Sequence, residues 1–411
     1  MNVRLAIVAT HPIQYYAPLF RRLAERGVLN VHVFYGWAGA SLDGVRDPGF
    51  GLSVRWDVPL LNGYEFTFVP NRSRDPGTQH FRGLDNPDLI PSLLAWQPDV
   101  VLVFGWAHRS HLRALRALHG RVPILFRGDS TLLDERPGVR RLARRAWLTW
   151  VYRHVDLALY AGQHNREYFL RHGLGEDQLA WVPHAVDNER FAASDEERRE
   201  EAESWRAAEG IPKGATTVLY SGKLETVKAP GVLLRAFRTA AAGEDHLVFV
   251  GSGPLESALR AAAEGDPRIH FLGFQNQSRM PVVYRLGDIF VLPSRSETWG
   301  LAVNEAMACG RPVIVGDRVG CAPDLVHPGK NGLVVPANDP DALGAALRGL
   351  SDDPALRRAM GSASREIIRD WSIERAALSI EEQVYRSFSA PPARPRQLMS
   401  ASSPPVGTGP C

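Results

Sequence analysis

The sequence predicts an α/β protein with two Rossmann-like domains, whose parallel sheets face a central cleft. Two observations favour this fold class. Short apolar runs alternate with longer amphipathic stretches along the chain, a pattern typical of parallel strand–helix units. The length of 411 residues also exceeds what a single hydrophobic core usually supports. Ligands are therefore expected in the cleft, at the carboxyl ends of the strands.

The first domain is expected over residues 1–190. Val3–Ala9 is an apolar run typical of a buried first strand, and Pro18–Arg26 follows as an amphipathic helix. Val100–Phe104 and Ile124–Phe126 are continuous apolar runs, which is the pattern of strands buried on both faces of a sheet.

The second domain is expected over residues 191–371. It is entered through Ala193–Glu209, a Glu- and Arg-rich stretch typical of a solvated helix or linker. The predicted strands of this domain are Thr216–Tyr220, Leu247–Val250, Ile269–Leu272, Ile289–Leu292, Val313–Val315 and Leu333–Val335. A last helix is expected over 372–388, and the Pro-, Ser- and Gly-rich residues 389–411 predict a disordered tail.

Charge and cysteine usage exclude several classes of protein. The net charge of +3 is too small to indicate a nucleic-acid partner. Cys309, Cys321 and Cys411 are odd in number and lack metal-ligand spacing, which favours a reducing cytoplasm. No apolar run approaches the roughly 20 residues of a membrane-spanning helix, so the chain is expected to be cytoplasmic and at most peripheral on a membrane.

No metal site is expected from the spacing of the titratable residues. Asp339-Pro340-Asp341 places Asp and Pro where they cap and begin a helix. His108 and His111 have a spacing that suits a metal, but no third ligand is visible. They are interpreted as two histidines at the start of a helix.

Two lysines lie close together in a chain whose basic residues are mostly arginine. Only four of the 48 basic residues are lysine, and Lys223 and Lys228 follow Gly222 at the end of a predicted strand. Compact ammonium groups in a turn at the mouth of a sheet suit a phosphate or diphosphate. The alternative is a pair of ordinary surface lysines. The turn is not a P-loop, because the required glycine and Ser/Thr positions are missing.

A second chemistry-bearing stretch runs from Pro293 to Gly310 and opens a helix near Gly300. The first-turn amides at Gly300, Leu301 and Ala302 should point into the cleft, where they form a ready anion site.

Two carboxylates flank this helix start. Glu297 precedes the helix and Glu305 lies about one turn inside it, so both could accept hydrogen bonds from hydroxyls along one elongated ligand. The alternative is a glutamate that favours the helix dipole and an ordinary helical glutamate.

Glu297 and Glu305, with seven residues between them in Ser296–Gly310, resemble the E-x7-E motif of family-4 retaining glycosyltransferases, which have the GT-B fold. Other stretches match the family in order: Ser221–Lys228, Val250–Pro254, Ala322–Val326, Asn331–Val334 and Val182–Asp187. The resemblance is specific from Val182 to Pro336 and looser over the N-terminal half.

The resemblance implies that a hexose moves from a UDP- or GDP-sugar to a carbohydrate or lipid-linked acceptor with its configuration retained. The task would be cell-surface polysaccharide or glycoconjugate synthesis. The resemblance implies no metal, because lysines and helix amides would take up charge as the nucleoside diphosphate leaves. It implies no cofactor, because the nucleotide sugar is a co-substrate. By motif position, Lys223 and Lys228 would hold the diphosphate, Glu297 the donor-sugar hydroxyls and Glu305 the ribose. The helix at 372–388 would cross back to the first domain. The alternatives are a GT-B isomerase or phosphorylase, or a non-catalytic sugar-nucleotide-binding protein.

The sequence departs from the family pattern at two places. Thr10–Tyr16 replaces a Gly-rich loop that is still expected to face the cleft, so His11 or Gln14 could touch donor phosphate or acceptor; the alternative is that His11 is a structural histidine. Asp129 stands where many relatives have a histidine near the reacting sugar. It could be a general base or acceptor anchor, or a simple turn former.

The stretch 140–150 invites a membrane interpretation. At helical spacing one face carries arginines and another carries apolar side chains; the arginines are Arg140, Arg141, Arg144 and Arg145, and the apolar residues are Leu142, Ala146 and Trp150. Such helices bind anionic lipid surfaces. The alternative is that the apolar face is buried in the first domain.

Overall fold

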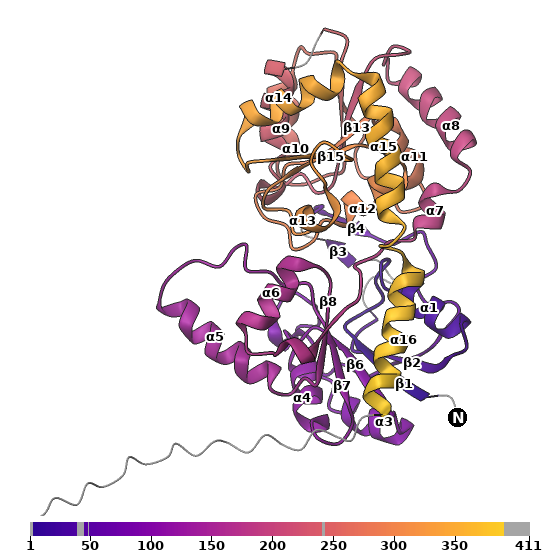
Figure 1. The fold of residues 1–411 in the computed structure, drawn as a ribbon, viewed down its shortest axis with the longest axis vertical. Helices are drawn as coiled ribbons and strands as arrows, with labels where there is room; N and C mark the ends of the chain where they lie inside the picture. Colours follow the sequence, from indigo (N-terminus) through magenta and orange to yellow (C-terminus); the bar gives the residue numbers. More distant parts are fainter. Residues whose placement is uncertain (1–2, 39–44, 48, 241–242, 390–411) are drawn as a thin grey trace, which may run out of the picture.

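The computed structural model describes residues 3–38, 45–47, 49–240 and 243–389. Two α/β domains follow one another along the long axis of the molecule (Figure 1). Within the described residues, the first domain holds a seven-stranded sheet in the order β5-β2-β1-β6-β7-β8-β9, and the second a six-stranded sheet in the order β12-β11-β10-β13-β14-β15. Every strand pair in both sheets is parallel, so the predicted fold class is confirmed.

The strands of the first domain are β1 (Val3–Ala9), β2 (Leu29–Tyr35), β5 (Glu65–Phe68), β6 (Val100–Phe104), β7 (Ile124–Arg127), β8 (Leu157–Tyr160) and β9 (Leu179–Trp181). Its helices are α1 (Ala17–Glu25), α3 (Leu89–Trp96), α4 (Arg109–Leu118), α5 (Val139–Tyr152) and α6 (Gln163–Arg171). Side chains alternate across the sheet. Leu5 and Ile7 enter the core on one face, and Ala6 and Val8 enter the core on the other.

The strands of the second domain are β10 (Thr217–Ser221), β11 (His246–Val250), β12 (Ile269–Phe271), β13 (Ile289–Leu292), β14 (Val313–Gly316) and β15 (Gly332–Val335). Its helices are α7 (Asn188–Ala192), α8 (Asp195–Ala208), α9 (Pro230–Ala240), α10 (Glu256–Ala263), α11 (Met280–Leu286), α12 (Leu301–Ala308), α13 (Ala322–Leu325), α14 (Pro340–Ser351) and α15 (Pro354–Ile368). Each predicted strand is found within a residue of its expected bounds.

The entry to the second domain is a helix, the first of the two expected forms, and Ala202 is its only buried residue. Ala202 of α8 is buried against Val282 and Leu286 of α11. At the start of the helix, Asp195 accepts hydrogen bonds from the buried guanidinium of Arg285, at 2.9 and 2.7 Å. The Glu- and Arg-rich composition therefore describes only the outer face of α8.

Helix α16 (Ile373–Ser389) returns from the second domain and packs on the first (Figure 1). Its residues Ala377 and Ile380 belong to the core of the first domain, and Glu381 accepts a hydrogen bond of 2.8 Å from Arg26. Ser389 is the last residue of this helix rather than the first of a tail. The remainder of the expected tail, residues 390–411 with Cys411, lies outside the described residues.

Helix α5 is exposed where the sequence suggested burial. Leu142 and Trp147 are 61% and 43% exposed, and Ala146 is exposed as well. The buried residues of the helix are Leu148, Val151 and Tyr152. The alternative in which this apolar face is buried is therefore wrong for Leu142 and Ala146 and holds for Trp150, which packs against the core of the first domain. Among the described residues, no helix has the length and apolarity needed to cross a membrane.

The two motifs interpreted as structural are helix starts. Asp339 caps α14 by accepting hydrogen bonds from the amides of Asp341 (3.1 Å) and Ala342 (2.9 Å). His108 and His111 lie at the start of α4. Over the described part of the chain, no group of three or more His, Cys, Asp or Glu side chains is placed to hold a metal ion.

Candidate active site

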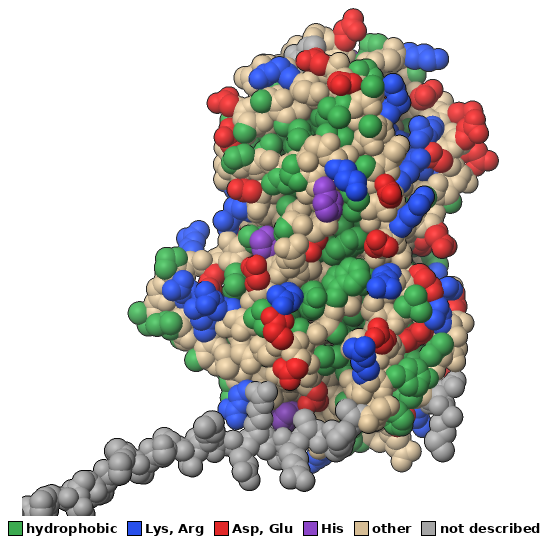
Figure 2. Space-filling view, viewed as in Figure 1, with side chains coloured by type: hydrophobic (Ala, Val, Ile, Leu, Met, Phe, Trp, Pro, Cys, Tyr) green, Lys and Arg blue, Asp and Glu red, His purple; other side chains and the backbone are tan. Residues whose placement is uncertain are grey.

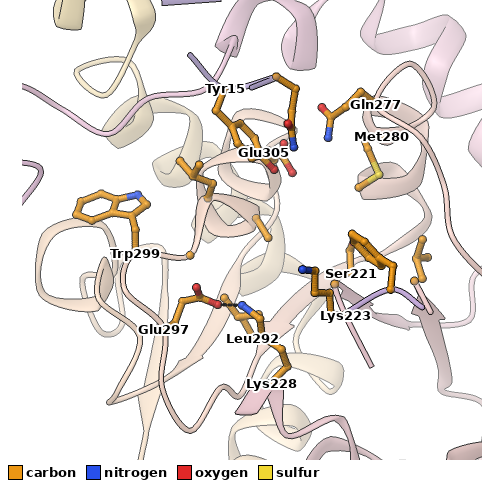
Figure 3. A pocket seen from close by; sticks show the side chains of 18 of the residues that line it. Tyr15, Ser221, Lys223, Lys228, Gln277, Met280, Leu292, Glu297, Trp299 and Glu305 are labelled. Atoms are coloured by element: carbon orange, nitrogen blue, oxygen red, sulfur yellow. Dashed lines mark hydrogen bonds and ion pairs between the residues drawn. The ribbon is translucent and has the colours of Figure 1, made fainter. Parts of the chain in front are cut away.

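A cavity of about 380 Å³ lies between the two domains, at the carboxyl ends of their strands (Figure 3). The predicted site residues that line it are Gly222, Lys223, Lys228, Glu297, Gly300, Leu301, Ala302, Glu305 and, from the first domain, Asp129. His11 is not among the lining residues. The fold thus brings together groups that are separated in the sequence by as much as 176 positions, from Asp129 to Glu305.

Lys223 follows β10, where two loops approach one another closely. Gly251 has a φ of +132°, and a Cβ on it would lie 2.0 Å from the carbonyl oxygen of Gly222, so a side chain there would force the loops apart. The hydroxyl of Tyr220 donates to the Lys223 carbonyl at 2.7 Å. These contacts hold the lysine at the rim of the sheet.

The Lys223 ammonium pairs with a carboxylate of the other domain. Its Nζ lies 2.9 Å from Oδ1 of Asp47. Burial raises the pKa of Asp47, but the hydrogen bond from Lys223 and those from the amides of Phe50 and Gly49 outweigh it, and the net shift is downward.

Lys228 ends the short 3-10 helix η3 (Thr226–Lys228), and its ammonium donates to the carboxylate of Glu297 (Figure 3). Glu297 is held by its backbone, because its carbonyl accepts a hydrogen bond of 2.9 Å from the amide of Gly320. Both predicted phosphate-binding lysines therefore face carboxylates. The site carries paired charges that an incoming anion could separate.

Helix α12 begins at the cavity wall. Its cap, Gly300, has a φ of +99°, a conformation that favours glycine, and the amide of Val303 donates to the Gly300 carbonyl at 2.8 Å. Leu301 and Ala302 form the first turn and line the cavity. The helix N-terminus thus presents its positive dipole end to the site.

Glu305 lies one turn further along α12 and is 2% exposed. Its Oε2 accepts a hydrogen bond of 2.6 Å from the hydroxyl of Tyr284. Burial raises the pKa of Glu305 to about 7, although Tyr284, Arg190 and Tyr15 favour the charged form. Tyr15 reaches this carboxylate from the loop after β1, so the first domain closes over it (Figure 3).

Asp129 and His11 have different surroundings. Asp129 follows β7, lines the cavity and accepts a hydrogen bond of 3.3 Å from the hydroxyl of Thr298 in the second domain. His11 lies beside Thr10, whose Oγ1 is 3.0 Å from its Nδ1. Burial, helped by nearby His108, lowers the pKa of His11 to about 4.

Several lining residues had no signal in the sequence. Asp47, Phe50 and Trp56 come from the segment between β2 and β5, and Tyr284 lies in a helix whose apolar sequence is typical of a buried core. Tyr15 belongs to the loop that was expected to face the cleft through His11 or Gln14; of these two, Gln14 lines the cavity. A tyrosine is common in cores, so its type alone did not mark it as a site residue.

Two Rossmann-like domains with a cavity between them are the architecture of the GT-B fold. Sucrose-phosphate synthase from Thermosynechococcus elongatus superposes with a TM-score of 0.69 at 22% identity, covering 94% of this chain and 98% of that one. HepE from Anabaena, in complex with UDP and glucose, superposes with a TM-score of 0.70 at 16% identity, covering 94% of this chain and all of that one. These likenesses show that the chain has the GT-B fold.

Comparison of the amino-acid sequence also finds similarity to glycosyltransferases. Residues 201–367 match the family model described as glycosyl transferases group 1. D-inositol 3-phosphate glycosyltransferase 2 of Catenulispora acidiphila is 33% identical over 197 residues, which is 44% of this chain and 44% of that protein. The D-inositol 3-phosphate glycosyltransferase of Thermomonospora curvata is 28% identical over 374 residues, which is 84% of this chain and 83% of that protein. The first of these matches covers less than half of the relative's length.

Proposed function

We propose that this protein is a retaining glycosyltransferase of family 4. It would move a hexose from a UDP- or GDP-sugar to a carbohydrate or lipid-linked acceptor, in the synthesis of a cell-surface polysaccharide or glycoconjugate. The observation that carries the proposal is the convergence of two lysines, a helix N-terminus and two glutamates in one cavity. The match over residues 201–367 supports it.

The paired charges of the site indicate how a diphosphate would bind. Phosphate oxygens would take the place of the carboxylate oxygens now held by Lys223 and Lys228. Glu297, released from Lys228, would then accept hydrogen bonds from hydroxyls of the donor sugar, and Glu305 would accept them from the ribose. The lysines and the α12 amides would neutralise charge as the nucleoside diphosphate leaves, so we expect transfer without a metal ion.

The acceptor would bind on the side of the first domain. Asp129 lies there at the cavity wall, where it can serve as general base or acceptor anchor. For a lipid-linked acceptor, α5 would place the protein on the cytoplasmic face of an anionic membrane. Leu142 and Trp147 of this helix are exposed. Blue and green side chains lie side by side on the projection at the left of Figure 2, where Figure 1 labels α5.

The proposal is tested with Lys228→Ala. A lysine–phosphate contact is worth about 1.5–3 kcal/mol, so kcat/KM for the donor should fall about 10–150-fold while circular dichroism stays unchanged. Lys330→Ala, which removes an exposed lysine outside the cavity, is the matched control. Donor kinetics of Lys228→Ala within about twofold of wild type would overturn the assignment.

Measurements of transfer and of donor binding also test the role of Asp129 and distinguish the proposed function from the alternative functions. Asp129→Asn should lower the rate of transfer and leave donor binding intact. Binding of UDP or GDP without transfer or donor hydrolysis would instead indicate a non-catalytic binding protein. An isomerase or phosphorylase would act on a sugar without consuming a nucleotide donor.

A further inference from the structure

A hairpin of the first domain reaches across the cleft. It consists of β3 (Val45–Asp47) and β4 (Leu52–Val54), and it lies between the two domains in Figure 1. The Phe50 carbonyl accepts a hydrogen bond of 2.9 Å from the hydroxyl of Ser252 in the second domain. Beyond β4, the Arg55 carbonyl accepts one of 2.7 Å from the side chain of Asn276. The hairpin is thus docked on the loops that follow β11 and β12.

Asp47 is fixed so that its carboxylate meets Lys223. Its Oδ1 accepts hydrogen bonds from the amides of Gly49 (2.8 Å) and Phe50 (3.1 Å), and the same oxygen lies 2.9 Å from Nζ of Lys223. A carboxylate, like a phosphate group, is an anion whose oxygens accept charge-assisted hydrogen bonds from an ammonium. Asp47 therefore occupies a position that a phosphate would take.

An aromatic cluster lies next to this ion pair. The rings of Phe50 and Phe274 meet edge to face with centroids 5.0 Å apart, and Trp56 lies 6.4 Å from Phe274. All three side chains line the cavity together with Lys223 and Glu305. Aromatic side chains suit a flat nucleobase, because every base has a π-face that can stack. These three lie beside Lys223 and Glu305, the side chains to which the proposed function assigns the phosphate and the ribose.

We propose that this hairpin is part of the nucleotide site: Phe50 recognises the base of a nucleoside diphosphate together with Phe274, and Asp47 holds the place of a phosphate on Lys223 until the nucleotide binds. The inference rests on the proposed function and adds a residue of the first domain that contributes to base recognition. Binding of the diphosphate displaces Asp47 from Lys223.

A purely structural hairpin would behave differently. If Asp47 only tethered the domains or positioned Lys223, removing its charge would weaken nucleotide binding or leave it unchanged. If it competes with phosphate, removing its charge strengthens binding. The sign of the effect therefore distinguishes the two roles.

The first experiment is Asp47→Asn in the full-length protein. Asparagine keeps an oxygen that can accept from the amides of Gly49 and Phe50, so the turn is preserved while the charge is lost. Calorimetric titration with UDP and GDP should show affinity about 3–10-fold higher than wild type for the nucleotide that wild type binds. Affinity for the corresponding nucleoside, which has no phosphate, should not change. Unchanged or weaker binding of the diphosphate would overturn the role of Asp47.

The second experiment is Phe50→Ala, with Phe50→Tyr as the conservative variant. Loss of one base–aromatic stack should weaken binding of both nucleoside and diphosphate by about 5–100-fold, and tyrosine should restore most of it. Phe81→Ala, which removes a 41% exposed aromatic side chain outside the cavity, is the control and should bind like wild type. Wild-type affinity in Phe50→Ala, with an unchanged melting temperature, would overturn base recognition by Phe50.

The outcomes separate this inference from the proposed function. Failure of wild type to bind either nucleotide would overturn both. If wild type binds a nucleotide and Lys228→Ala weakens that binding while the hairpin variants have no effect, the proposed function stands and the hairpin inference falls.

Discussion

Glu305 shows how a single residue combines a predictable position with unpredictable surroundings. The spacing of the two glutamates placed it one turn inside a helix at the cleft, and it lies there. Its partners could not be predicted, because Tyr284 comes from a different helix and Tyr15 from the other domain. Sequence spacing describes one helix, whereas the pKa of a buried carboxyl depends on every element packed around it.

The raised pKa of Glu305 predicts a pH-dependent stability. Between the ordinary glutamate pKa of 4.5 and the folded value of about 7, the native state binds more protons than the unfolded state. The free energy of unfolding should therefore fall as pH rises through this window, by an amount on the order of 3 kcal/mol. Glu305→Gln, which stays neutral, should lose that dependence.

This prediction is checked by urea unfolding at pH 5 and pH 8. Relative to wild type, Glu305→Gln should gain stability at pH 8 and change little at pH 5. Glu244→Gln, at an exposed position, should keep the wild-type pH profile. A Glu305→Gln variant with the same pH dependence as wild type would contradict the assignment.

Among the elements, strands were easier to predict than the hairpin that completes the site. Runs such as Ile289–Leu292 are wholly apolar and buried, so composition alone marks them. β3 and β4 have three residues each, too few to show a period of two, and their position depends on contacts with the second domain. Asp47 and Phe50 were missed for that reason.

The exposed arginines and apolar side chains of helix α5 predict binding to anionic membranes. The full-length protein should co-sediment with anionic vesicles at low salt, and the bound fraction should fall as salt screens the arginines. Reversing Arg140 and Arg144 to glutamate should weaken vesicle binding at least about 10-fold. Arg145 is left in place because it pairs with Glu135 at 2.7 Å.

The control for this prediction is a double variant with the same change in net charge in the second domain. Arg235→Glu with Arg358→Glu alters two exposed arginines of the second domain and should bind vesicles nearly as wild type does. An equal loss of vesicle binding in both double variants would indicate that binding depends on the net charge of the protein and not on α5. No sedimentation of wild type at low salt would rule out a membrane contact through α5.

At the scale of the whole molecule, the stability of the first domain depends on α16, which lies near the end of the chain and completes the core of that domain. Ile380 is 1% exposed and packs in the core of the first domain. Alternating apolar runs predicted both sheets, but the closure of the cleft was not predictable, because it depends on pairs such as Asp324 with the Gln163 amide. Such pairs join residues that no local pattern relates.

Ile380→Ala should destabilise the first domain by about 2–4 kcal/mol, the usual cost of a buried cavity of this size. Hydrogen exchange should show lower protection in β1 and β6, with β10 and β11 unchanged. Leu378→Ala, at a position on the same helix that is 39% exposed, should have little effect. Equal loss of protection in both sheets would show that the domains unfold as one unit.

The return of α16 also means that the chain passes between the domains twice. The two passages lie side by side: Val186 bridges Ser372, and the side chain of Asn188 donates to the carbonyl of Ile368 at 2.8 Å. A molecule joined by one linker can twist freely, but two linkers fastened to each other define a single hinge axis. We therefore expect any opening of the cleft to be a rotation about that axis. Each closure would return Asp129 and Thr298, which lie on opposite sides of the cleft, to the same distance.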